Sequence, residues 1–105
     1  MAIDYELLFK NMLAAASGSL KTDAPKVQAY LQQVMQNHKD VLVQLAKDRI
    51  SGKISDADLQ AELGDEKEAL QAEMEGAEVI AEKAAQDAVN AAVGVLTAAI
   101  KAAVP

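Results

Sequence analysis

The run of residues 55–104 constrains this chain more than any other feature, because it contains no proline and no cluster of loop-forming residues. Ala, Glu and Leu are frequent in it, and all three favour helix. At a rise of about 1.5 Å per residue, one unbroken helix over this run would be about 75 Å long. Such a helix needs partners along its whole length, so the sequence predicts a helical assembly or interaction protein.

Apolar residues at three- and four-residue spacing predict a first helix over residues 4–16, with Asp4 as its N-cap. The following Ser-Gly-Ser, residues 17–19, is expected to end this helix.

A second helix is predicted over residues 23–51. Asp23 is its expected N-cap, Pro25 suits the first turn, and Gly52 suits the position just beyond the end. Its apolar residues form a heptad-like seam, and Tyr30, Met35, Leu42 and Ala46 widen that seam to the face of a bundle helix. The seam residues are Val27, Leu31, Val34, His38, Val41 and Leu45.

The turn after this helix is the best-specified local structure. Ser55 is predicted to cap the third helix, with Asp58 three residues later completing a capping box. Ile54 and Leu59 flank this box as a hydrophobic staple, so the second and third helices are expected to form an antiparallel hairpin. The third helix is predicted over residues 55–104.

Three glycines offer places where the third helix could break: Gly64, Gly76 and Gly94. Each costs about 1 kcal/mol relative to alanine inside a helix, which does not end a helix without a turn partner. Gly76 is the expected kink.

The chain is therefore predicted to be all-α and a single domain over residues 1–105, with a short N-terminal helix and a long antiparallel helical hairpin. The second helix covers the third only to about residue 84, since both have the same rise per residue. Residues 85–104 are apolar on more than one face and lack a hairpin partner, which favours completion of a bundle by self-association. The expected interface comprises Val89, Ala92, Val95, Leu96, Ala99 and Ile100. In a monomer, the helix would instead break near Gly76 and fold back into a four-helix bundle.

Charge and composition narrow the function classes. The net charge is −6, and residues 54–83 alone carry −8, so no nucleic-acid partner is expected. Cysteine is absent, which excludes disulfides and fits the cytoplasm. The acids near the N-terminus do not fit a signal peptide. Asn90, Thr97 and Lys101 interrupt the apolar segment 88–104, so we expect no membrane span.

No residue pattern predicts catalysis or a cofactor. His38 is the single histidine and is expected to pack in the seam of the second helix. If it is buried, its protonation below a pKa of about 6.5 is expected to loosen packing, which makes it a candidate pH-sensitive residue. Glu75, Glu78 and Glu82 share one side of the third helix, but no Glu-x-x-His pair accompanies them, so no metal site is expected.

The sequence thus favours a non-enzymatic structural or adaptor protein that forms homo-oligomers through its Ala/Val-rich C-terminal helix. One alternative is a module that accepts an amphipathic helix from a protein partner, with the acidic block selecting a basic partner. A further alternative is a membrane-surface helix, against which the single lysine of the C-terminal segment, Lys101, argues.

Overall fold

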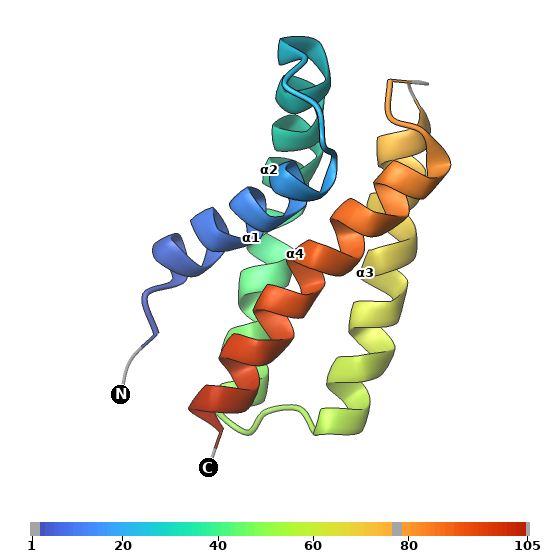
Figure 1. Ribbon diagram of the computed structural model, residues 1–105. Helices are drawn as coiled ribbons and strands as arrows, with labels where there is room; N and C mark the ends of the chain where they lie inside the picture. Colours follow the sequence, from blue (N-terminus) through green and yellow to red (C-terminus); the bar gives the residue numbers. More distant parts are fainter. Residues whose placement is uncertain (1–2, 77–78, 105) are drawn as a thin grey trace.

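The computed structural model describes residues 3–76 and 79–104, and within these ranges the chain forms α-helices and no strand (Figure 1). The helices are α1 (Tyr5–Ser19), α2 (Pro25–Ile50), α3 (Asp56–Gly76) and α4 (Glu82–Ala103). The predicted all-α class is confirmed, and one cluster of buried apolar side chains draws on all four helices.

The third predicted helix does not run unbroken to residue 104. Helix α3 ends at Gly76, the expected kink, and α4 begins at Glu82 and folds back beside α3 (Figure 1). The longest dimension of the molecule is 40 Å, far below the roughly 75 Å of one continuous helix. Ile80, in the connection, is only 4% exposed, so burial of an apolar side chain holds this connection against the core. Residues 77 and 78 lie outside the described part.

Helix α4 is covered within the same chain. It contacts α1, α2 and α3, and its most extensive packing is against α1. The α4 side chains that face inward include the small Ala85, Ala88 and Ala92, whereas α1 supplies the larger Phe9 and Met12. Small side chains on one helix let another helix with large ones approach closely, and this complementarity fills the core. The apolar segment that lacked a hairpin partner thus finds its partners by folding back.

The predicted hairpin of α2 and α3 is confirmed in detail. The Ser55 backbone N–H donates to Asp58 Oδ2 at 3.2 Å, and the Asp58 N–H donates to Ser55 Oγ at 3.0 Å. Gly52 has a φ of +85°, the left-handed conformation that glycine adopts readily just beyond a helix. Leu59 is buried and Ile54 half-buried, as the staple requires.

The other helix ends agree only in part with those predicted from the sequence. Asp4 caps α1, since its side chain accepts a hydrogen bond of 3.1 Å from the Leu7 N–H. The prediction for α2 was wrong by one residue, because its N-cap is Ala24 rather than Asp23 and no side chain caps it. Helix α1 continues to Ser19, through the residues expected to break it.

The buried face of α2 also differs from the predicted seam. Leu31 and Val34 of the seam are buried, but Val41 is 46% exposed. Met35, Leu42 and Ala46, which were predicted to widen the seam, complete the buried face. A strict seven-residue repeat suits a supercoiled pair, whereas a helix of 3.6 residues per turn drifts away from that repeat over several turns. The wider face covers more than one neighbouring helix.

Candidate functional site

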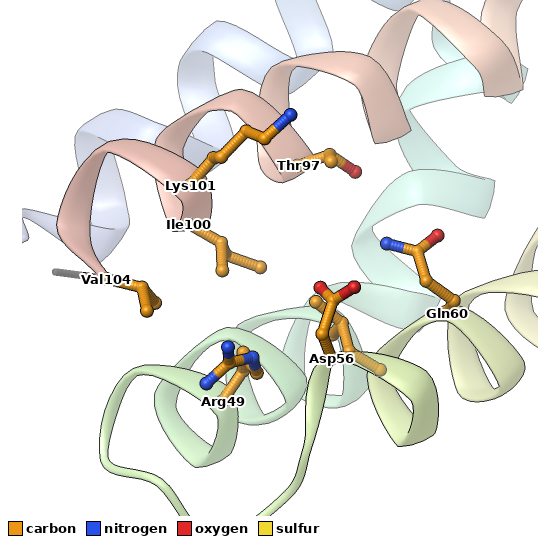
Figure 2. Close-up of a pocket in the computed structure, with 8 residues that line it drawn as sticks. Arg49, Asp56, Gln60, Thr97, Ile100, Lys101 and Val104 are labelled. Carbon is orange, nitrogen blue, oxygen red and sulfur yellow. The ribbon is translucent and has the colours of Figure 1, made fainter.

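A surface depression lies between α3 and α4. It consists of two adjoining hollows of about 350 and 480 Å3, which share Gln60, Thr97 and Lys101 in their walls. We call the joined hollows the α3–α4 groove. The first hollow also reaches the end of α2, and Figure 2 shows α4 on one side of it and the ends of α2 and α3 on the other.

The floor of the groove is apolar. Leu59 and Leu63 contribute from α3, and Val93 and Ile100 from α4, and each is no more than 6% exposed. These side chains belong to the core and are close-packed beneath the groove. Thr97, Gln60 and Asn90 add hydrogen-bonding groups to the walls. An apolar floor with a polar rim is the usual composition of a recognition surface.

Two glycines line the second hollow, one from each helix: Gly64 from α3 and Gly94 from α4. An added Cβ would meet no other atom within 4 Å at either position, and neither residue has a positive φ. The fold therefore requires glycine at neither position. Because glycine weakens a helix interior relative to alanine, these residues reduce helix stability and at the same time keep the groove wide.

The charges that line the groove are mainly positive. Arg49, Lys67 and Lys101 border it, against the single carboxylate of Asp56. Among the described residues, none of these three cations makes an ion pair; the pairs present involve His38, Lys39 and Lys83. A chain with a net charge of −6 thus presents a local excess of positive charge in this groove.

A second cluster of interacting side chains joins α2 to α3 around His38. The Nδ1 atom of His38 lies 3.1 Å from Glu66 Oε2, and Nε2 lies 2.6 Å from Glu73 Oε2. Glu73 also accepts a hydrogen bond of 3.0 Å from the Asn37 side-chain amide. The Tyr30 hydroxyl donates to the Glu73 backbone carbonyl at 2.5 Å. We call His38, Glu66 and Glu73 the histidine clamp.

The clamp favours the protonated imidazolium, in which both ring nitrogens donate. Burial is the largest single influence and lowers the pKa of His38, but hydrogen bonds and charge from Glu73 and Glu66 together outweigh it, so the pKa is raised above 6.5. The Asn37 amide and then His38 lower the pKa of Glu73 below 4.5. This geometry favours the opposite of the sequence-based expectation, since a protonated His38 donates to Glu66 and Glu73 of α3 from both ring nitrogens.

The residues predicted to form an interface lie mostly inside one chain. Val89, Ala92, Leu96 and Ile100 are buried in the core, and Val95 and Ala99 are half-buried beside it. Only Ile100 also borders the α3–α4 groove. The unpaired apolar segment that motivated self-association is thus covered within the chain.

The sequence analysis considered three glutamates as metal ligands and expected no site, because no Glu-x-x-His pair accompanies them. Glu75 is half-buried near the end of α3, Glu82 is exposed at the start of α4, and Glu78 lies outside the described residues. Within residues 3–76 and 79–104, no three His, Asp or Glu side chains are arranged to hold a metal ion.

Sequence reasoning missed the α3–α4 groove. Gly64 and Gly94 were considered as possible breaks in a continuous helix, and Lys67 was counted within an acidic block. Spacing offered one signal, since Gln60, Gly64 and Lys67 follow each other at four and three residues and so share one helical face. The partners of that face on α4 become evident only after the chain turns back.

Residues 3–76 and 79–104 thus form an all-α fold of four packed helices, with a surface groove lined by three cationic side chains and one carboxylate. Comparisons of the chain with protein-family models, with curated proteins and with solved structures gave no match. Among the described helices, none combines the length and the hydropathy needed to cross a membrane.

Proposed function

We propose that this protein is a non-enzymatic protein-binding module that accepts an amphipathic helix of a partner protein in the α3–α4 groove. The observation that carries the proposal is the groove itself, with its floor formed by Leu59, Leu63, Val93 and Ile100 and its polar walls. An amphipathic helix binds such a groove by laying its apolar stripe on the floor and keeping its polar face in water.

The length of the groove suits a helix of about three turns. The α3 residues that line it run from Asp56 to Lys67, a distance of about 16 Å along the helix axis. A helix satisfies its own backbone hydrogen bonds, whereas an extended peptide would need a sheet edge or water for them. The described part of the chain has no strand and so offers no such edge.

Self-association through the C-terminal helix is supported less well. Four of the six residues expected at that interface are buried within one chain. The large apolar side chains that are exposed in the described part are Leu7 and Val41, on α1 and α2 rather than on α4. We also propose that the protein is located in the cytoplasm, as expected from the absence of cysteine in its sequence.

A capture experiment with a blocked groove tests the proposal. The full chain and a Gly94→Leu variant would be used as baits in an extract of source cells, with bound proteins identified by mass spectrometry. Gly94 lines the second hollow and an added Cβ there meets no other atom within 4 Å, so we expect the leucine side chain to extend into the groove. We expect a protein that is retained by the original chain and lost from the variant.

An Ala14→Leu variant is the matched control, since it adds bulk at an exposed position of α1 outside the groove. This control is expected to retain the partner. If both variants capture the same proteins as the original chain, the groove is not the binding surface and the proposal fails.

A further inference from the structure

The charged residues that line the α3–α4 groove are mainly positive, whereas the net charge of the whole chain is −6. This difference bears on the charge expected of the partner. Arg49, Lys67 and Lys101 border the groove, and Asp56 is the one acid among its lining residues. Figure 2 shows Arg49, Asp56 and Lys101 around the first hollow, on the ends of three different helices.

We propose that the occupant of the groove is an acidic amphipathic helix, with small side chains on its apolar stripe and Asp or Glu beside that stripe. This inference rests on the proposed function and specifies its partner. It reverses the basic partner that the acidic block of residues 54–83 suggested.

Local charge outweighs net charge at this site because salt screens the distant carboxylates. At physiological ionic strength the electrostatic screening length is about 8 Å, which is about half the length of the groove. A carboxylate bound beside Lys67 or Lys101 therefore experiences those ammonium groups much more strongly than acids on other faces of the molecule. Two of the acids in the block, Glu66 and Glu73, are also engaged with His38.

The two glycines indicate small side chains on the occupant. Gly64 and Gly94 leave space where any other residue would place a Cβ, and the fold itself does not need that space. A partner helix with Ala, Gly or Ser at the facing positions can bring its backbone close to α3 and α4 there. The same close approach would exclude a stripe of large side chains at those positions.

A pair of designed peptides tests the inference on the full chain. Both are helices of about 14 residues with the same apolar stripe, which has Ala at the positions that face Gly64 and Gly94 and Leu elsewhere; one peptide has Glu beside the stripe and the other has Lys. Binding is followed by NMR titration of the isotope-labelled protein, which reports both affinity and the residues contacted. We expect the Glu peptide to bind about tenfold more tightly at low salt, with shifts at Gly64, Gly94 and Thr97 and a preference that declines as salt is added.

Charge reversal supplies the control. A Lys67→Glu/Lys101→Glu variant is expected to prefer the Lys peptide, whereas Lys10→Glu, at an exposed position of α1, is expected to keep the original preference. Equal binding of both peptides in the groove, or a preference for the Lys peptide, overturns the acidic partner and leaves the proposed function standing. If neither peptide shifts the groove resonances, the proposed function fails as well.

Discussion

His38 lies between two carboxylates, so the folded chain holds its proton more tightly than the unfolded chain does. Its pKa is raised in the fold, and linkage then fixes the sign of the pH dependence. The stabilisation is fully present below the unfolded pKa of about 6.5 and is lost as the pH rises through the folded pKa. We therefore expect the free energy of unfolding to fall as the pH is raised from about 6 to 8.

Urea denaturation across that pH range measures this effect. A His38→Gln variant removes the titrating group and is expected to lose the downward slope. Glu66→Gln, which removes one of the two carboxylates, should reduce the slope without abolishing it. A slope that persists unchanged in His38→Gln would assign it to another group and contradict the role given to the histidine clamp.

Single residues were predictable where their effect depends on near neighbours in the sequence. Ser55, Asp58 and Gly52 act within a few residues of their own positions, and all three have the predicted roles. His38 was recognised, but its partners Glu66 and Glu73 lie 28 and 35 residues away along the chain. The sign of its pH response depends on those carboxylates, so it could not be derived from the seam alone.

At the level of the helices, we expect substitution of the two groove glycines, Gly64 and Gly94, to change the stability of the fold and the binding of a partner in opposite directions. Gly64→Ala and Gly94→Ala each replace a flexible residue in a helix interior with the best helix former, at positions with space for the new methyl group. We expect each variant to raise the free energy of unfolding by about 0.5–1 kcal/mol. Chemical denaturation at fixed pH measures this gain.

The same two variants should weaken binding of the Glu peptide, because a methyl group enters the space that the backbone of the proposed partner would occupy. Gly18→Ala in α1 is the control, since its added methyl group also meets no other atom within 4 Å and lies outside the groove. It should leave peptide affinity unchanged. Binding that is unaffected by Gly64→Ala and Gly94→Ala would remove the close-approach argument.

Helix boundaries show how far local sequence determines an element. The sequence located the hairpin of α2 and α3 because a capping box, a staple and a glycine all agree there. It named Gly76, where α3 ends, as the expected kink, but it did not decide whether the chain turns back there, since residues on both sides of Gly76 favour helix and no side chain caps the start of α4. Burial of the apolar α4 face against α1, α2 and α3 decides that boundary, and this burial depends on the whole chain.

For the molecule as a whole, side chains from α1, α2, α3 and α4 share one core, so a substitution in the buried face of α4 is expected to destabilise the entire fold. Leu96 is fully buried in the cluster that all four helices form. We expect Leu96→Ala to lower the free energy of unfolding by about 2–5 kcal/mol, through lost burial and the cavity left behind. The neighbouring Val95 is half-buried, so Val95→Ala should cost less. Equal effects in urea denaturation would mean that α4 is not packed as described.

The molar mass in solution tests whether α4 is covered within one chain or by a second copy of it. Because α4 is covered within one chain, we expect a monomer of 11.1 kDa by size exclusion with light scattering, over a wide range of concentrations. A stable dimer would restore self-association as the leading function. A Val95→Glu variant would then show whether the half-buried side of α4 forms the contact.

The packing of α1 against α4 also bears on how the chain folds during synthesis. These two helices make the most extensive contact in the molecule, although α2 and α3 lie between them in the sequence. While a ribosome is still translating α4, the buried face of the nascent α1, which includes Phe9 and Met12, lacks its main packing partner. The core can close only after α4 emerges, so a stalled chain would expose these side chains to chaperones and proteases for as long as translation pauses.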